Sequence, residues 1–487
     1  MYPGNSLLQE KINKGIKYFE DNKLTEAIEI FEDLKLNKNT KNIGLLFLGI
    51  ISIKNKDNSK AKKYFKKILD NDSKHQEANL NLGLVYFSEK NYEKAEFFFD
   101  KLGKNLTTIY HKGLIYFHRK KYYDAIKSFE KCIEIDENFN FSYLNLGHSN
   151  LRLKKFDDAI NNYKIFLKRN PNDNISKFNL AWSYFGICDL ENGFEFYEYR
   201  KEKTEPKEKT LEVRKKLNPI EWSGENLDNK KILIISEQGI GDNIQFFRYL
   251  FSLKENYKCE IVFYTDKILQ HLFKNSPFQI ITDLKDEKDI DYFQNLLSLP
   301  GIFYKKNKFL QGPINYINFD NKKSLFWKNK LEKFKKPVIA LNWQGSKDFL
   351  FDDERSIDLI NFKNILNINK YSFISLQKNF GSEQIDKYNF SNLIYDFSNE
   401  IDINGKAFED TIHILININL LITSDTALAH LAGTMGIKTY LLLSYNPEWR
   451  WFIEIQKKCF YPEIKIIQQK EYGNWKGVFK QLEDLLV

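Results

Sequence analysis

Two short stretches place polar side chains where a buried strand gives way to a helix. In one of them, the apolar run Leu420–Thr423 leads into Ser424, Asp425 and Thr426, and the following helix carries His430. A helix that begins at such a turn presents unpaired N–H groups and the positive end of its dipole. This arrangement favours a bound diphosphate, with Asp425 orienting the ligand. The alternative is an ordinary αβ unit in which the aspartate caps the helix and the histidine is packed.

The other stretch follows the buried strand Lys231–Ile235 and reads SEQGIGDNIQFFRYL. Gly239 and Gly241 allow a tight turn there, and Asp242 opens a helix. At the carboxyl end of a first strand, Asp242 could face a cleft as a general base, although an aspartate at this position often only caps its helix. Neither GxGxxG nor GK[ST] is present, so dinucleotide or ATP binding is not predicted, and a nucleotide-sugar epimerase is disfavoured.

A third polar stretch, NWQGSKDFLFDDERSI, follows the predicted strand Val338–Trp343. Arg355 could bind a phosphate through both arms of its guanidinium, and Lys347 is a second cation of the same kind. The alternative for Arg355 is a salt bridge to one of its acidic neighbours, namely Asp352, Asp353 or Glu354.

These stretches require an α/β framework to position them. Short apolar runs between helical patterns predict two Rossmann-like halves, at residues 231–330 and 331–487. The predicted strands of the first half are 231–235, 260–265 and 279–281, and those of the second are 338–343, 373–377, 393–397, 420–424 and 438–443. Residues 201–230 are charge-dense and are predicted to be a linker.

The first 200 residues repeat with a period of about 34 residues and one shorter step of about 30. A small residue begins each repeat and a second small residue follows it by about 12; the pairs begin at Gly15, Gly49, Gly83, Gly113, Gly147 and Ala181. Small residues let two helices approach closely, and we expect the aromatic residues at matching offsets to fill the gap to the next hairpin. The pattern resembles tetratricopeptide repeats and predicts an all-α solenoid of about six repeats over residues 1–200.

Composition limits the class of protein. The 487 residues are enough for two or three domains. The formal charge of +9 arises from 74 basic and 65 acidic residues, which permits an anionic ligand but does not indicate nucleic acid. Four scattered cysteines predict neither disulfides nor a zinc site. We find no signal peptide and no apolar run that would span a membrane, so the expected location is cytoplasmic, or peripheral at the inner membrane.

Taken together, EQGIGDNIQFFRYL, NWQGSKDFLFDDERSI, FISLQK, FEDTIHIL, LLITSDTALAHLAG and YNPEWRWF resemble a bacterial group of proteins. These are tetratricopeptide-repeat proteins with a C-terminal domain similar to glycosyltransferase family 9, the ADP-heptose–lipopolysaccharide heptosyltransferase family. The resemblance covers nearly the whole chain. It implies a GT-B module, in which an acceptor half (231–330) and a donor half (331–487) face each other across a cleft.

The resemblance also implies roles for individual residues. Asp242 would be the base on the acceptor hydroxyl, with Gly239, Gly241 and Gln245 in the acceptor-side loop. The donor nucleotide and diphosphate would be bound by residues from the second half, namely Arg355, Lys347, Gln377, Ser424, Asp425, Thr426, Ala427, Leu428 and His430. This chain has Ala427-Leu428 where the heptosyltransferases carry Gly-Pro-like residues, and those enzymes lack the repeats. Donor sugar, nucleotide base and acceptor are therefore left open.

The expected function is inverting, metal-independent glycosyl transfer from a nucleotide-sugar co-substrate, with no other cofactor. A helix N-terminus and cationic side chains would offset the charge of the leaving diphosphate. The order of repeats and catalytic module also resembles that of protein O-GlcNAc transferases, so the acceptor is either a glycan or a protein, presented by the repeats or bound as a peptide on their concave face. The alternative is a catalytically silent scaffold for protein–protein interaction.

Overall fold

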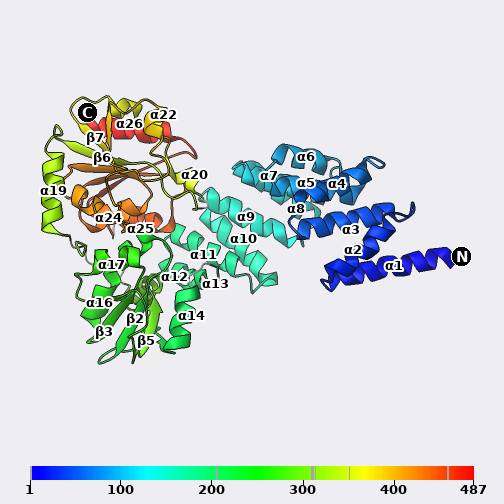
Figure 1. Ribbon diagram of the computed structural model, residues 1–487, viewed down its shortest axis with the longest axis horizontal. Helices are drawn as coiled ribbons and strands as arrows, with labels where there is room; N and C mark the ends of the chain where they lie inside the picture. The colour runs from blue at the N-terminus through cyan, green and yellow to red at the C-terminus, as the bar shows by residue number, and fades with distance from the viewer. Residues whose placement is uncertain are drawn as a thin grey trace. The chain divides into compact units, whose positions relative to one another are not determined.

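The computed structural model describes residues 3–203, 207–308, 312, 314–317, 319–349, 351–457 and 460–487 (Figure 1). Contacts divide the chain into two compact units, Met1–Pro171 and Asn172–Val487. A few residues of the segments discussed above lie outside the described part of the chain, namely 204–206 of the predicted linker, Leu350 of the polar loop, and Cys459.

The first unit consists of helical hairpins, in which each helix packs against the next one in the chain. Their bounds are α1 (Pro3–Glu20), α2 (Leu24–Leu34), α3 (Lys41–Lys54), α4 (Asn58–Leu69), α5 (Gln76–Ser88), α6 (Tyr92–Asp100), α7 (Leu106–His118), α8 (Tyr122–Ile135), α9 (Asn140–Arg152) and α10 (Phe156–Arg169). The predicted helical repeats are therefore present in this unit.

The repeated small residues make close packing possible within each hairpin. A Cβ atom at Gly49 would lie 2.3 Å from the ring of Phe65, and one at Gly83 would lie 2.4 Å from the ring of Phe99. Each aromatic ring thus covers the glycine of its own hairpin. The same rings also reach the next hairpin, as expected, since Phe99 stacks on His111 of α7 at 4.5 Å between ring centroids.

The turn between the two helices of a repeat is also repeated. One residue in each turn has a φ between 57° and 61°, in the left-handed region where a helix can end. These residues are Asn22, Lys56, Lys90, Lys120, Lys154 and Cys188. None is a glycine, so this turn was not visible as a glycine pattern in the sequence.

The second unit begins with a further hairpin, α11 (Asn174–Gly186) and α12 (Leu190–Tyr197), followed by α13 (Arg200–Lys203) and α14 (Lys207–Lys216). The range predicted as a linker holds α14 and the strand β1 (Ile220–Glu221). Val213 of α14 is fully buried in a cluster with Leu233 and Phe293. Val213 docks this charged helix on the sheet, together with Leu217 just after the helix, and the high charge of the segment concealed this.

The first sheet has the order β1-β5-β2-β3-β4, and all its strands are parallel. Its further strands are β2 (Lys231–Ile235), β3 (Glu260–Tyr264), β4 (Gln279–Ile281) and β5 (Tyr292–Asn295). The helices around it are α15 (Ile240–Phe246), α16 (Arg248–Asn256), α17 (Lys267–Phe273), η1 (Leu296–Ser298) and α18 (Leu299–Asn307). The three predicted strands are present, whereas β1 and β5 were not predicted.

The second sheet has the order β11-β10-β9-β6-β7-β8 and is also fully parallel. Its strands are β6 (Val338–Asn342), β7 (Ser372–Ser375), β8 (Ile394–Asp396), β9 (Leu420–Ser424), β10 (Thr439–Leu443) and β11 (Ile464–Gln468). Its helices are α19 (Asn321–Leu331), α20 (Asp352–Arg355), η2 (Leu359–Phe362), α21 (Lys363–Leu366), α22 (Gln384–Lys387), α23 (Thr411–Leu415), α24 (Ala427–Thr434), α25 (Trp449–Lys457) and α26 (Trp475–Leu486). All five predicted strands are present, and β11 is additional.

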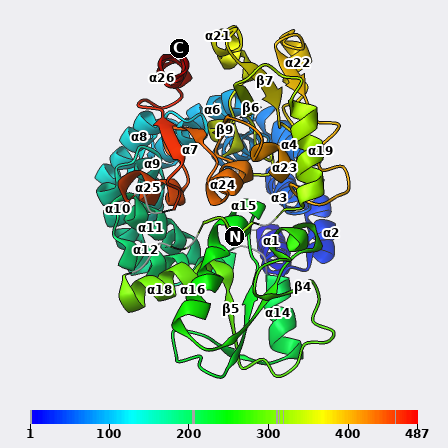
Figure 2. The ribbon, with the colours of Figure 1, turned by 90° about the vertical axis from the view of Figure 1, so that its left-hand side faces the viewer.

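Both sheets are doubly wound, and this fixes where a ligand would bind. The chain leaves β6 in one direction through β7 and β8, and then returns to β9 on the other side of β6. Ligands of such sheets bind outside the carboxyl ends of the two strands at this switch point. The helices that follow β9 and β2, α24 and α15, contact each other and lie side by side between the two sheets (Figure 2).

Candidate functional site

The turn before α24 is held by hydrogen bonds across the switch point of the second sheet. The hydroxyls of Thr426 and Thr423 both donate to Oδ1 of Asn342, at 2.9 and 3.1 Å. Asn342 in turn donates from Nδ2 to Oε1 of Gln377, at 2.9 Å. Thr426 is therefore a support for the turn, since its hydroxyl is already engaged with the neighbouring strand.

Gln377 uses both ends of its amide to fix the loop after β6. Besides Asn342, its Oε1 accepts from the backbone N–H groups of Trp343 and Gln344, at 3.0 and 2.9 Å. Its Nε2 donates to the backbone carbonyls of Gln344 and Phe380, at 2.9 and 2.7 Å. Its side chain is buried. It shapes the polar loop rather than presenting its amide outward.

Asp425 lies at the centre of the site. Its Oδ1 accepts a hydrogen bond of 2.8 Å from Nε1 of Trp451, and its backbone carbonyl accepts one of 3.1 Å from Nη1 of Arg355. Burial raises the pKa of this carboxyl above its usual value, and the guanidinium of Arg355 opposes that rise. Among the described residues, the side chain of Asp425 bonds to Trp451 and not to the start of the helix, and Thr426 is the residue at the N-cap of α24. The simple capping alternative for Asp425 is therefore not what the geometry shows.

His430 is packed between the two halves. Its Nδ1 lies 2.9 Å from the hydroxyl of Tyr461, and its ring stacks on Trp451 at 4.9 Å between centroids. Burial, followed by the nearby Arg450, lowers its pKa well below the usual value, so the ring is neutral. A Cβ atom at Gly241 of α15 would lie only 2.8 Å from the His430 ring. Gly241 is therefore the residue that allows α15 to reach α24.

Asp242 is bound on both sides of its carboxylate. Its Oδ2 accepts a 2.8 Å hydrogen bond from the backbone N–H of Gly239, which is the N-cap of α15. Its Oδ1 accepts from Nη2 of Arg450, a residue of α25 in the other half. The side chain is 18% exposed. Asp242 thus caps its helix and also forms the ion pair that joins the two halves.

The two predicted cations differ in their surroundings. Arg355 forms the local ion pair that the sequence left open, with 3.0 Å between its Nε and Oδ1 of Asp352. Its guanidinium also covers the ring of Phe349 at 4.3 Å. Lys347 is exposed, and its ammonium lies 4.7 Å from the centre of the Phe380 ring. Arg355 is therefore fixed beside Asp425, whereas Lys347 is at the surface.

Several buried polar atoms near these helices have no protein partner among the described residues. They are Oγ of Ser424, both amide atoms of Gln245, both amide atoms of Asn446, and Nε of Arg450. Gln245 lies one helical turn after Gly241, on the face of α15 that meets α24. Buried polar atoms are normally hydrogen-bonded, so these atoms mark places for water or a ligand. Ala427 and Leu428 begin α24, where backbone N–H groups point out of the helix.

The segment after β10 contributes functional side chains that have no predicted role in the sequence. Arg450 is 5% exposed and also pairs through Nη1 with Glu448. Burial raises the pKa of Glu448 to about 7, although Arg450 opposes the rise. Trp451 and Tyr461, which contact Asp425 and His430, come from the same region. The sequence signal was the arginine between two tryptophans in YNPEWRWF.

The site therefore brings together carboxylates and cations from both halves. The carboxylates are Asp242, Asp425 and Glu448, and the cations are Arg355 and Arg450. Such a set, beside a helix N-terminus, can bind an anion and can remove a proton from a neighbouring hydroxyl. Within the described part of the chain, we find no group of three or more His, Cys, Asp or Glu residues suited to a metal ion. None of the described helices is long and apolar enough to cross a membrane.

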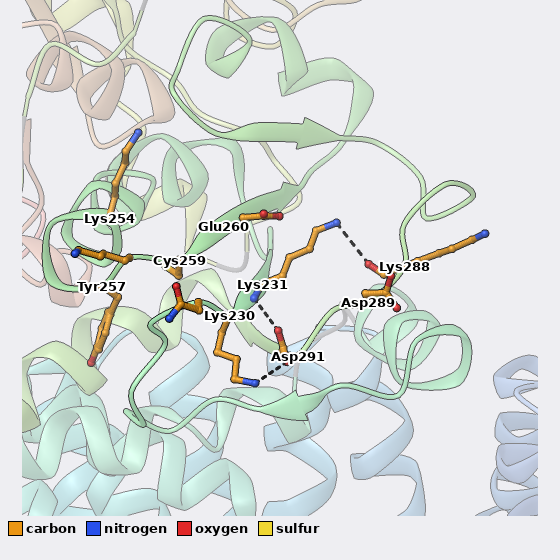
Figure 3. A pocket seen from close by; sticks show the side chains of 11 residues that line it. Lys230, Lys231, Lys254, Tyr257, Cys259, Glu260, Lys288, Asp289 and Asp291 are labelled. Carbon is orange, nitrogen blue, oxygen red and sulfur yellow. Dashed lines mark hydrogen bonds and ion pairs between the residues drawn. The ribbon is translucent and has the colours of Figure 1, made fainter.

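A hollow of about 820 Å³ lies elsewhere, at the opposite edge of the first sheet (Figure 3). Lys230 and Lys231, at the start of β2, and Glu260, at the start of β3, belong to its lining. Lys230 pairs with Asp291, and Lys231 pairs with Glu287. Figure 3 shows Lys254 and Lys288 pointing away from each other. The lysines of this hollow do not converge on one point.

Comparisons with known proteins concern mainly the repeats. Models of tetratricopeptide repeats match residues 52–114 and 144–199, and a model of subunit 3 of the anaphase-promoting complex, or cyclosome, matches residues 88–165. The predicted tetratricopeptide repeats are thereby confirmed. Protein FlbA of Caulobacter vibrioides (strain ATCC 19089 / CIP 103742 / CB 15) is 24% identical over 287 residues, which are 53% of this chain. The match spans 46% of that protein, so just under half of its length.

Similar solved structures are repeat proteins as well. A tetratricopeptide repeat protein from Parabacteroides merdae ATCC 43184 has a TM-score of 0.35 and 19% identity, over 41% of this chain and 80% of that one. PilW, a type IV pilus biogenesis factor, has a TM-score of 0.38 and 16% identity, over 42% and 98%. YrrB, described as having an unusual peptide-binding site, has a TM-score of 0.31 and 18% identity, over 39% and 100%. The chain thus combines tetratricopeptide repeats with an α/β region of two parallel sheets.

Proposed function

We propose that this chain is a GT-B glycosyltransferase that moves a sugar from a nucleotide-sugar donor to a glycan or protein acceptor. The observation that carries the proposal is the contact between α15 and α24. It brings Asp242 of one doubly wound half to the turn of Asp425 and His430 in the other. Because ligands of such sheets bind at the carboxyl edge, a donor bound at α24 would lie next to Asp242.

In this proposal the second half binds the donor. The first N–H groups of α24 and the hydroxyl of Ser424 provide donors for the diphosphate, and Arg355 provides a fixed positive charge beside them. These groups offset the negative charge that develops on the diphosphate as it leaves. The transfer would therefore proceed without a metal ion.

Asp242 would remove the proton from the acceptor hydroxyl, whose oxygen then attacks the anomeric carbon while the nucleoside diphosphate departs. A single displacement of this kind inverts the configuration at that carbon. The repeats would present the acceptor, since tetratricopeptide solenoids have extended surfaces that bind other proteins. A peptide on their concave face is one form that such an acceptor could take.

The second candidate function is a scaffold without catalytic activity. The observation that favours it is the closed state of the site, in which Asp242 and Arg355 already have ion-pair partners. In that case the repeats would bind a partner protein, and the α/β region would serve as a docking unit.

Thermal unfolding with added nucleotide sugars separates the two candidates. Every tryptophan of the chain, from Trp182 onward, belongs to Asn172–Val487, so tryptophan fluorescence follows this unit alone. Ligand at 100 times its Kd should stabilise the unit by about 2.7 kcal/mol. We expect one class among UDP-, GDP-, ADP-, CMP- and dTDP-sugars to raise the midpoint. The increase should be smaller for Asp425→Ala, and unchanged for Lys288→Ala in the distant hollow. If no nucleotide sugar raises the midpoint at millimolar concentration, the scaffold is the better account.

Turnover is tested separately, by release of free nucleoside diphosphate from the donor that binds. Asp242→Asn should retain donor binding and lose release, because the amide cannot accept the proton. Equal release by Asp242→Asn and the natural chain would exclude Asp242 as the base.

A further inference from the structure

The environment of Arg450 is that of a cation shared between competing anions. Its Nη2 donates to Asp242 across the contact between the halves, and its Nη1 donates to Glu448, just before the start of α25. Its Nε is buried and has no protein partner among the described residues. One guanidinium therefore serves two carboxylates, and its Nε–H is still available to a further anion.

Arg450 also lies at the edge of the sheet where the donor is proposed to bind. It follows β10, the strand next to β9, and β9 leads directly into α24. The adjacent residue, Trp451, donates to Asp425 at 2.8 Å and stacks on His430 at 4.9 Å. The segment that carries Arg450 is thus part of the same site as the N-terminus of α24.

The position of Arg450 is fixed by the residue before it. Trp449 is almost fully buried, and its ring stacks on Phe185 of α11 at 4.4 Å. It also lies 5.0 Å from Tyr197 and 6.0 Å from Phe246, between ring centroids. These contacts hold the start of α25 in place, so the guanidinium can change partners without a movement of the helix.

We infer that Arg450 is a further donor-binding residue, which exchanges the Asp242 carboxylate for the diphosphate of the nucleotide sugar. This inference rests on the proposed function. A diphosphate offers several charged oxygens to a guanidinium, which binds such groups through two parallel hydrogen bonds. Donor binding would then release the Asp242 carboxylate for the acceptor hydroxyl, so the base becomes available only when a donor is present.

Binding of nucleoside diphosphates to two variants tests this role, because the exchange predicts opposite effects. Arg450→Gln should bind UDP, ADP, GDP or CDP about tenfold to hundredfold more weakly than the natural chain, since a charge-assisted pair is lost. Asp242→Asn should bind the same nucleotide several-fold more tightly, because the competing carboxylate is gone. Isothermal titration of the full chain provides both values, and Lys288→Gln is the control for a change of charge elsewhere.

A purely structural ion pair would behave differently, since breaking it from either side should weaken binding or leave it unchanged. Equal affinity of Arg450→Gln and the natural chain, or weaker binding by Asp242→Asn, would overturn the role of Arg450 while the proposed function stands. If the natural chain binds no nucleoside diphosphate, both the inference and the proposed function fail. Should Arg450→Gln not fold, Arg450→Lys replaces it; the lysine keeps the charge but not the two-armed geometry, and an intermediate loss is expected.

Discussion

Position 241 leaves no room for a side chain at the contact between α15 and α24. A Cβ atom there would lie 2.8 Å from the ring of His430 and 3.2 Å from Cα of Ala427, which belongs to the backbone of the other helix. Gly239, two residues earlier, is less constrained, because a Cβ atom would meet only the carboxylate of Asp242, at 3.1 Å. The two glycines of this short motif are therefore required to different degrees: packing against α24 excludes a side chain at Gly241, whereas Gly239 meets no such barrier.

We predict that Gly241→Ala destabilises the second unit by about 1–3 kcal/mol, because the added methyl group forces the two helices apart. Gly239→Ala should have a clearly smaller effect. Urea unfolding followed by tryptophan fluorescence measures both variants. Equal destabilisation by the two substitutions would show that α15 and α24 approach each other less closely than the 2.8 Å distance at Gly241 implies.

Glu448 predicts a dependence of stability on pH. Its pKa rises from 4.5 to about 7 on folding, chiefly through burial. Between these values the folded chain binds more protons than the unfolded chain, so this residue lowers stability as pH rises from 4.5 to 7. The loss is on the order of 2–3 kcal/mol.

Glu448→Gln should lose this contribution, so the stability of the variant relative to the natural chain should increase as pH rises through that range. The free energy of unfolding of both chains, measured at pH 4.5, 6 and 7.5, checks this. Parallel curves for the two chains would contradict the prediction.

The effect of substituting a helical glycine depends on how closely that glycine is packed. Gly83 of α5 lies under the ring of Phe99, which is fully buried, whereas Gly477 in the first turn of α26 has open space where a side chain would be. The first substitution must displace a packed ring. The second only replaces a flexible residue by a better helix former.

Gly83→Ala should lower the temperature at which the helical circular dichroism of the repeats is lost, at a cost of about 1–3 kcal/mol. Its tryptophan transition should be unchanged, because the first unit contains no tryptophan. Gly477→Ala should instead stabilise the second unit by up to about 1 kcal/mol, which raises the temperature of the tryptophan transition. If Gly83→Ala left the transition temperature of the repeats unchanged, Phe99 would have to be able to move aside.

For the whole molecule, the boundary between the compact units does not coincide with the end of the repeats. The last hairpin belongs to Asn172–Val487. Arg200, just after that hairpin, is fully buried and donates to Glu237 at 2.6 Å and to the hydroxyl of Ser298 at 2.8 Å. Glu237 lies at the carboxyl end of β2, so the last repeat closes the switch point of the first sheet.

We therefore expect a fragment of residues 172–487 to fold with the tryptophan transition of the full chain. A fragment of residues 201–487 should not fold stably. It lacks Arg200, so Glu237 is left buried without this ion-pair partner, and Trp449 becomes exposed. Breaking a buried ion pair from one side costs about 3–5 kcal/mol. Expression of both fragments and comparison of their fluorescence transitions tests this. A stable fragment of residues 201–487 would contradict it.

Much of the architecture could be predicted from the sequence because it depends on local patterns. The spacing of small residues specified the helical hairpins, and continuous apolar runs specified the central strands such as β2 and β9. The edge strand β1 and the partly polar β5 lack such runs, so they were missed. The turn of Ser424, Asp425 and Thr426 was also found, since its residues are consecutive.

Only the tertiary structure determined how the polar residues are used. Asp242 and Arg450 are far apart in the sequence, and no local pattern predicts that they form an ion pair. The sequence offers Gln377 and Thr426 to a ligand, but the fold places Asn342 of strand β6 beside both, where it takes up hydrogen bonds of each. The physical reason is that helix and strand formation depend on neighbouring residues, whereas the partner of a side chain depends on which distant segments the completed sheets place next to it.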